Sequence, residues 1–237
     1  MKRFFALLSA VLLAALYAGR PVQPALQAAA LQEPQYVALT FDDGPRRDTT
    51  SALLDGLLER GAHATFFVIG QQIPGNEDLL LRMAEEGHQI GNHTYSHVSL
   101  QGTAEFTAIE EIHKTEVLLE ELLGPGDYWL RPPYGLVDSR TSALVSTPMV
   151  YWSLDPEDWK KLDAGQVARQ ILQNVKSGDI VLLHDFYPTS VEAALQVIDA
   201  LQGEGYVFLT VRELMEQFGT QPQAGALYAS ATQERSW

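Results

Sequence analysis

An alternation of short apolar runs with amphipathic segments fills the chain between residues 35 and 219, and it restricts the fold to a few architectures. Seven runs have the composition of buried strands, at 37–41, 65–69, 89–91, 128–130, 149–153, 180–183 and 206–209. A helical period follows each of them, at 51–60, 77–86, 104–123, 139–145, 164–176, 190–201 and 211–218. Strands that alternate with helices pair in parallel. Because no glycine-rich nucleotide loop follows the first run, we expect an α/β fold of the distorted parallel (β/α)7–8 barrel type rather than an open doubly wound sheet.

The N-terminal segment predicts export. Lys2 and Arg3 precede an uncharged, largely apolar run at 4–18. This run has the length of a signal-peptide core and is shorter than the roughly 20 residues of a membrane span. We therefore expect residues 1–34 to be a signal peptide plus linker and the protein to be extracellular or at the cell surface, with a retained membrane anchor as the alternative. One folded domain is expected at 35–219, followed by a weakly structured tail at 220–237.

The composition excludes several kinds of site. The chain has no cysteine, so a disulfide, a thiolate nucleophile and a cysteine-ligated metal are all ruled out. Its 16 basic and 30 acidic residues give a net charge of −14, which argues against nucleic acid as a partner. No feature of the sequence implies a protein partner. Any metal site must be built from histidine, aspartate and glutamate.

Polar side chains gather directly after five of the predicted strands. The segments are TFDDG at 40–44, NHTYSH at 92–97, RPPYG at 131–135, DPEDW at 155–159 and LLHD at 182–185. Each segment alone has an ordinary interpretation as a polar turn. In a parallel barrel, however, the carboxyl ends of the strands share one rim, and active sites are built there. The five segments together therefore favour a catalytic cleft at that rim.

Two of these segments predict a metal site. His93 and His97 form an H-x-x-x-H pair, and either Asp42 or Asp43 adds a carboxylate from the neighbouring strand end. Two imidazoles and one carboxylate leave coordination positions open for water and substrate, which is typical of catalytic metal sites. The alternative is a pair of polar loop residues that cap a turn. Consecutive aspartates point in different directions, so one is expected to bind a cation and the other to act as general base.

The remaining segments supply a candidate general acid. His184 ends an apolar strand, and a carboxylate from Asp155 or Asp158 would keep its ring protonated near neutral pH. The alternative is a histidine satisfied within the core. Arg131 is expected to pair with one of the rim aspartates, either to orient it or as a simple salt bridge. Tyr134 and Trp159 serve either as packing residues or as aromatic faces against a sugar ring.

In this order and spacing, the five segments resemble the motifs of the polysaccharide deacetylases, the NodB-homology domain of carbohydrate esterase family 4. The resemblance spans the chain from about residue 37 to 218. It implies a distorted βα barrel and one divalent metal, usually zinc with cobalt or nickel as substitutes. The implied metal ligands are Asp43, His93 and His97.

The resemblance also implies the catalytic roles. Asp42 would be the general base, oriented by Arg131, and Asp158 would tune His184 as the general acid. Substrate binding would fall to the acetyl-methyl pocket of Leu182 and Trp159 and to the backbone N–H of Tyr134, which would help to hold the oxyanion.

These roles imply a metal-dependent extracellular deacetylase that hydrolyses N-acetyl groups of N-acetylglucosamine-containing glycans, in peptidoglycan or chitin-like oligomers. An acetylxylan esterase that removes O-acetyl groups is the alternative within the same fold, because the two reactions differ only in the leaving group. A non-catalytic glycan-binding module is the alternative of another class, but every catalytic position is filled. An iron oxygenase with the same ligand types is disfavoured because its fold is antiparallel β.

Overall fold

The structure is a computed structural model, and it describes residues 33–235. The strands in this range are β1 (Gln35–Asp42), β2 (Thr65–Val68), β3 (Gln89–Asn92), β4 (Met149–Val150), β5 (Ile180–His184), β6 (Tyr206–Phe208), β7 (Leu227–Ser230) and β8 (Gln233–Arg235). The helices are α1 (Arg47–Arg60), α2 (Glu77–Glu85), α3 (Glu105–Leu123), α4 (Ser139–Ser142), α5 (Asp158–Lys161), α6 (Ala164–Asn174), α7 (Pro188–Gly203) and α8 (Val211–Gln217). The predicted export segment lies outside the described residues, apart from its last two positions.

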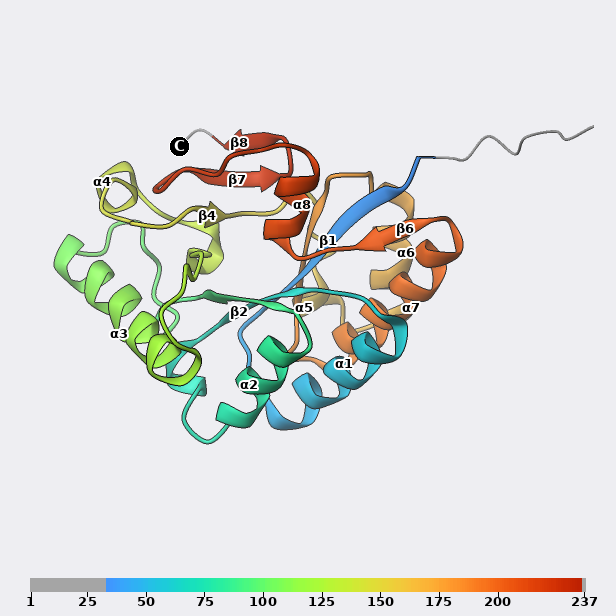
Figure 1. Ribbon diagram of the computed structural model, residues 1–237, viewed down its shortest axis with the longest axis horizontal. Coiled ribbons are helices and arrows are strands. Elements are labelled where there is room, and N and C mark those ends of the chain that lie inside the picture. The colour runs from blue at the N-terminus through green and yellow to red at the C-terminus, as the bar shows by residue number, and fades with distance from the viewer. Residues whose placement is uncertain (1–32, 236–237) are drawn as a thin grey trace, which may run out of the picture. The chain divides into compact units, whose positions relative to one another are not determined.

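Strand β1 is the centre of the main sheet (Figure 1). The strand order is β3-β2-β1-β5, every pair is parallel, and β6 pairs with the first three residues of β1. The last six residues of β1 are buried, as expected for a parallel strand covered on both faces. The register between β1 and β5 sets Asp42 opposite His184. Two of the predicted catalytic residues are therefore neighbours at the carboxyl ends of adjacent strands.

The predicted parallel α/β architecture is confirmed, but the regular ladders do not close into a barrel within residues 33–235. A second sheet has the order β4-β7-β8, and isolated bridges connect it to the first. Leu130 bridges to Asn92 of β3 and to Met149 of β4. The strand predicted at 128–130 is reduced to the two isolated bridges of Leu130, because Pro132 and Pro133 follow it and have no N–H to continue a ladder.

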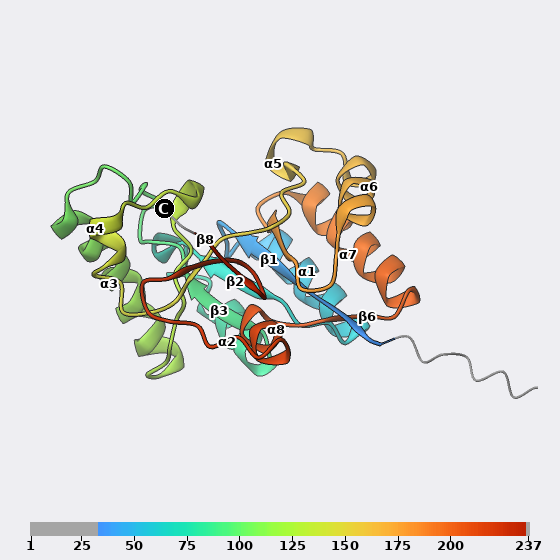
Figure 2. The same cartoon turned by 90° about the horizontal axis from the view of Figure 1, so that it is seen from above.

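Helices cover the outer face of the main sheet. Helix α7 packs against both α1 and α6, and the three lie side by side in Figures 1 and 2. Helix α7 buries Ala193, Ala194, Val197 and Ile198, which are spaced three and four residues apart on one face. This face joins the apolar side chains of β1 and β5 in the largest core cluster. None of the helices in the described range combines the length and the apolar character that a bilayer crossing requires.

The prediction of a weakly structured tail at 220–237 is wrong for the residues that the structure describes. Strand β7 pairs in parallel with β4, and β8 pairs antiparallel with β7 (Figure 1). Leu227, Tyr228 and Ala229 are all buried. A run of four apolar residues, at 226–229, is too short to predict a strand by itself, and its partner β4 lies almost eighty residues earlier in the chain. The folded unit therefore extends beyond the predicted limit at residue 219.

Candidate active site

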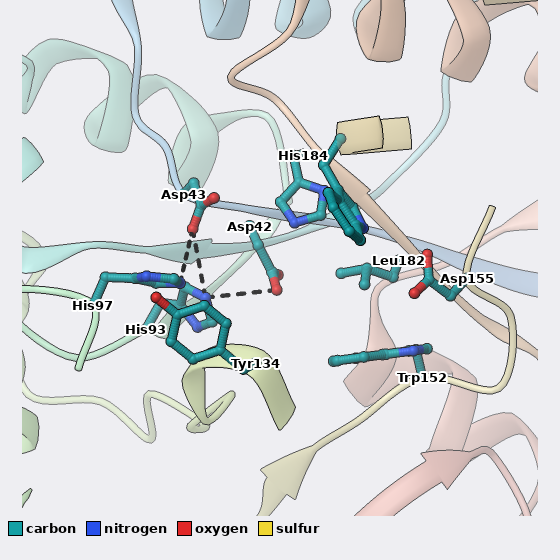
Figure 3. A pocket seen from close by; sticks show the side chains of 10 residues that line it. Asp42, Asp43, His93, His97, Tyr134, Trp152, Asp155, Leu182 and His184 are labelled. Carbon is teal, nitrogen blue, oxygen red and sulfur yellow. Dashed lines mark ion pairs between the residues drawn. The ribbon is translucent and has the colours of Figure 1, made fainter. Parts of the chain in front are cut away.

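A cavity of about 440 Å³ opens at the carboxyl ends of the main-sheet strands (Figure 3). Its lining residues are Asp42, Asp43, His93, His97, Tyr134, Trp152, Asp155, Trp159, Leu182 and His184. Eight of the ten side chains predicted from the sequence are among them. The other two, Arg131 and Asp158, are fully buried behind the wall. The structure therefore brings all five polar segments to one cleft.

Asp43, His93 and His97 form a three-residue donor set whose ligand atoms all lie within 4.8 Å of one another. Asp43 Oδ1 is 3.6 Å from Nε2 of His93 and 3.3 Å from Nε2 of His97. This oxygen is buried and has no hydrogen-bond partner. His93 Nδ1 donates to the carbonyl oxygen of Arg131 over 2.7 Å, so the lone pair of Nε2 is free to bind a cation. The donor set and its orphaned oxygen fit a divalent metal that takes nitrogen and oxygen ligands.

The backbone around the donor set is held in conformations that L-residues seldom adopt. The φ angles of Asp43, Thr94 and His97 are 74°, 63° and 61°. Such left-handed residues persist only where the surroundings compensate for the strain. Asn92 provides part of that compensation, because its side chain accepts from the Thr94 N–H and donates to the Ile112 carbonyl in α3, each over 2.9 Å. The local fold thus aims the two imidazoles at the carboxylate.

Asp42 is oriented by a buried guanidinium. Arg131 Nη1 donates to Asp42 Oδ1 and to Thr40 Oγ1, each over 2.7 Å, and Nη2 donates to the Tyr151 carbonyl over 2.7 Å. Burial lowers the pKa of Arg131, whereas the charge of Asp42 favours its protonated form. The second oxygen, Oδ2 of Asp42, remains on the cleft side, 3.7 Å from His93 Nε2. One oxygen is therefore fixed and the other faces the predicted metal site.

His184 stands across the cleft from the donor set (Figure 3). Asp158 Oδ1 pairs with its Nδ1 over 2.8 Å, and Asp158 Oδ2 accepts the backbone N–H of His184 over 2.8 Å. Burial opposes the charged ring, but the hydrogen bond and charge of Asp158, together with Asp42 and Asp43, outweigh it and raise the pKa of His184 to about 9. With Nδ1 occupied, Nε2 is the nitrogen available to donate a proton. The four-residue helix α5, which the sequence did not predict, carries Asp158 into place.

The remaining walls are mostly apolar. Leu182 and Trp159 both line the cleft, and the exposed ring of Tyr134 lies 4.7 Å from that of His97. Trp152 is a cleft residue that sequence reasoning missed, since its position depends on how the chain turns after β4. Asp155 also lines the cleft, and burial raises the pKa of its carboxyl group. The walls therefore offer flat aromatic faces beside a few polar groups, as small-molecule binding clefts do.

Asp185 is a second residue that the sequence did not single out. It is completely buried below the cleft, where its Oδ2 accepts from the hydroxyl of Thr50. Burial raises the pKa of Asp185 to about 7, and the charges of Asp43 and Asp42 act in the same direction. The sequence feature that could have indicated this residue is its position directly after His184 in the segment LLHD.

Comparison with known proteins places these features in context. A sequence model described as polysaccharide deacetylase matches residues 30–151. A peptidoglycan-N-acetylmuramic acid deacetylase of Bacillus subtilis is 36% identical over 180 residues, which are 76% of this chain and 38% of that protein. A peptidoglycan-N-acetylglucosamine deacetylase of Listeria monocytogenes is 36% identical over 199 residues, 84% of this chain and 42% of that protein. The match therefore covers only about two fifths of the length of these two relatives.

Other relatives are covered more fully. A peptidoglycan-N-acetylglucosamine deacetylase of Bacillus cereus is 34% identical over 187 residues, 76% of this chain and 87% of that protein. Among solved structures, a family 4 acetyl xylan esterase from Clostridium thermocellum in complex with a cobalt ion is 30% identical. It superimposes with a TM-score of 0.80 over 84% of this chain and 100% of its own. The solved structure of a peptidoglycan deacetylase from Bacillus subtilis is 35% identical in sequence to this chain. It superimposes with a TM-score of 0.77 over 79% of this chain and 93% of its own.

Proposed function

This chain belongs to the polysaccharide deacetylase family, and from that premise we propose that it is a metal-dependent hydrolase of the N-acetyl groups of N-acetylglucosamine-containing glycans, with peptidoglycan as its substrate. One observation carries the proposal: the donor set of Asp43, His93 and His97 lines the same cleft as a fixed carboxylate, Asp42, and a protonated imidazole, His184. Relatives named as peptidoglycan deacetylases support the choice of glycan.

The donor set would hold zinc, or cobalt in its place, as the cobalt ion of the acetyl xylan esterase suggests. When bound there, the metal acidifies a water and polarises the acetyl carbonyl. Asp42 takes the proton of the attacking water on Oδ2, while Arg131 holds Oδ1 and so keeps the carboxylate correctly turned. A general base of this kind must be anchored, because its contribution depends on reaching the proton at hydrogen-bond distance.

His184 completes the reaction as general acid. An amine is a poor leaving group until its nitrogen is protonated, so a proton must be delivered as the carbon–nitrogen bond breaks. Asp158 keeps the ring charged at neutral pH, and Nε2 then donates to the departing nitrogen. We assign the methyl group of the acetyl to the apolar cleft residues Leu182 and Trp159, and the oxyanion to the backbone N–H of Tyr134.

Acetylxylan esterase activity is the second candidate. It is favoured by the superposition with the acetyl xylan esterase of Clostridium thermocellum and by a bifunctional xylanase/deacetylase of Pseudobutyrivibrio xylanivorans that is 35% identical over 195 residues. The same base, acid and metal ligands serve an ester, whose alcohol leaves more readily than an amine. A non-catalytic binding module is disfavoured because no catalytic position is lost.

We propose an extracellular or cell-surface location. Lys2, Arg3 and the apolar run at 4–18 support an export signal, with a retained anchor as the alternative. The proposed substrate lies outside the cell membrane, which agrees with export. Fractionation of cells that produce the full chain tests this: recovery in the medium or membrane fraction supports it, and recovery in the cytoplasm contradicts it.

The test of function is acetate release by the zinc-loaded full chain from N-acetylglucosamine oligomers, peptidoglycan and acetylated xylan in parallel. Release from the amino-sugar substrates that a chelator abolishes and zinc restores supports the proposal. Release from xylan alone would replace it with the esterase. Release from none of the three would reject hydrolysis and favour a glycan-binding role.

A further inference from the structure

A buried carboxylate lies directly beneath the loop that follows β1. Asp185, at the end of β5, is 0% exposed, and its Oδ2 accepts from the hydroxyl of Thr50 in α1. Its other oxygen, Oδ1, is buried and has no hydrogen-bond partner. A carboxylate with one hydrogen bond in a buried site is costly, since lost hydration is replaced only in part. The contacts of this side chain must therefore account for its presence in the core.

Asp185 touches the backbone of the aspartate loop. A Cβ on Gly44 would overlap both carboxylate oxygens, so the carboxylate packs against the loop in the space where a side chain would stand. The same Thr50 hydroxyl accepts the backbone N–H of Arg46 over 2.7 Å. On the other side of the loop, the Gly44 carbonyl accepts the N–H of Ile69 over 2.9 Å. The loop is thus held from below by the carboxylate and at its far end by the hydroxyl.

The residue that this support fixes is Asp43. It precedes Gly44 and has a φ of 74°, a conformation that an aspartate keeps only when its neighbours impose it. In that conformation its Oδ1 faces the Nε2 atoms of His93 and His97. If the loop relaxed, the carboxylate would turn away, whereas the imidazole of His93 is held independently of the loop by the carbonyl oxygen of Arg131.

We propose that Asp185 and Thr50 form a positioning pair that holds the aspartate loop so that Asp43 completes the metal site. The inference rests on the metal site of the proposed function, and it assigns the pair no contact with substrate. Two consequences follow. Loss of the Thr50–Asp185 hydrogen bond weakens metal binding, and Asp185→Asn does so as well, because an NH2 group replaces one of the two oxygens that pack against Gly44.

The chain offers a matched control. Thr49 is the neighbour of Thr50 in α1 and is 7% exposed, and its hydroxyl is buried with no hydrogen-bond partner. Thr49→Val and Thr50→Val therefore remove the same hydroxyl from adjacent buried positions, and only the second removes a bond to Asp185. Thr50→Ser restores the hydroxyl and loses only a methyl group.

The experiment measures the dissociation constant of Zn²⁺ for the metal-free full chain, by competition with a chromophoric chelator, and the visible absorption spectrum of the Co²⁺ form. We expect Thr50→Val to weaken Zn²⁺ binding by about 10-fold to 100-fold, the range for residues that orient metal ligands, and to alter the Co²⁺ spectrum. Thr49→Val should leave both unchanged, and Thr50→Ser should recover most of the affinity. Far-UV circular dichroism verifies that each variant is folded.

Equal Zn²⁺ affinity of Thr50→Val and Thr49→Val would overturn the proposal, even if Thr50→Val melts at a lower temperature. Should Thr50→Val fail to fold, Asp185→Asn decides: weaker Zn²⁺ binding supports the proposal and wild-type affinity overturns it. The readout is metal binding alone. A chain that binds Zn²⁺ as expected but releases no acetate would refute the proposed reaction and leave this inference intact.

Discussion

At the scale of single residues, the proposed mechanism divides the site into groups that would hold the metal and groups that would move protons. Asp43, His93 and His97 point at one another, whereas Asp42 is turned by Arg131 so that one oxygen faces the cleft. The sequence predicted the cluster from the paired aspartates and spaced histidines at strand ends, but it left open which aspartate binds the cation, and only the family resemblance assigned Asp43 to that role. The support beneath these residues could not be read from the sequence, since it depends on how β1 and β5 align.

The first prediction separates these two groups. Asp42→Asn should lower turnover by at least about 10²-fold, the contribution of a positioned general base, while the bound zinc remains. His93→Ala should lose the zinc itself, because it removes one of three ligands. Metal content by atomic emission and acetate release from N-acetylglucosamine oligomers check both variants. If both retain metal and activity, the assigned site is wrong.

The second prediction concerns the His184–Asp158 pair. Because the pKa of His184 is raised to about 9 in the folded protein, the general acid should stay protonated until the pH approaches 9. In Asp158→Asn the main cause of the rise is lost and burial remains, so the alkaline limb of kcat should move to lower pH. Profiles of kcat between pH 5 and 10 measure this shift of the alkaline limb, and the ordinary pKa of a histidine, about 6.5, is the reference value. An unmoved limb would show that another group carries the proton.

The raised pKa of His184 also makes the stability of the fold depend on pH in a predictable direction. A histidine whose folded pKa lies above its unfolded value stabilises the fold fully below pH 6.5 and loses this contribution as the pH rises through 9. The metal-free protein should therefore lose more stability between these limits than metal-free Asp158→Asn does. Urea titrations at a series of pH values compare the two, and parallel curves would contradict the assignment.

At the scale of elements, sequence reasoning succeeded where an element is long or strongly periodic. Strand β1 and helices α3 and α7 lie within a few residues of their predicted limits. It failed for elements whose existence depends on distant partners. Helix α5 has only four residues, and β7 exists because β4 offers it an edge and a core to cover. The local sequence pattern does not encode pairings between segments that are distant in the chain.

The third prediction tests whether the C-terminal hairpin belongs to the fold. Leu227 in β7 is 2% exposed and packs with Leu130 and Met149 in one core cluster. Leu227→Ala should lower the free energy of unfolding by about 2–5 kcal/mol, the usual cost of this change in a core. Glu234→Ala, at an exposed position in β8, is the control and should change it by less than about 0.5 kcal/mol. If urea denaturation gives both variants the same change in the free energy of unfolding, the C-terminal hairpin does not contribute to the stability of the fold.

At the scale of the whole molecule, the two ends of the main sheet have different tasks. The carboxyl ends carry the strained loops, the buried charges and the cleft. The amino ends carry His88, just before β3, whose Nδ1 accepts the backbone N–H of Ala64 over 3.2 Å. Its Nε2 is buried, 3.8 Å from a carboxylate oxygen of Glu86. In a parallel fold of this kind chemistry is found at the first end, and the second end serves stability.

The fourth prediction follows from His88. Burial, with the charges of His63 and Arg82, lowers the pKa of His88 to about 4. The unfolded chain takes up this proton below pH 6.5 and the folded chain does not until about pH 4, so stability is lost as the pH falls between these values. His88→Asn keeps an acceptor for Ala64 and does not titrate. It should be less stable at pH 7 because side-chain volume is lost, yet show a flatter decline towards pH 4 in urea titrations. An equally steep decline would place the acid sensitivity elsewhere, whereas a flatter one would show that the end of the sheet remote from the cleft sets the acid limit of the fold.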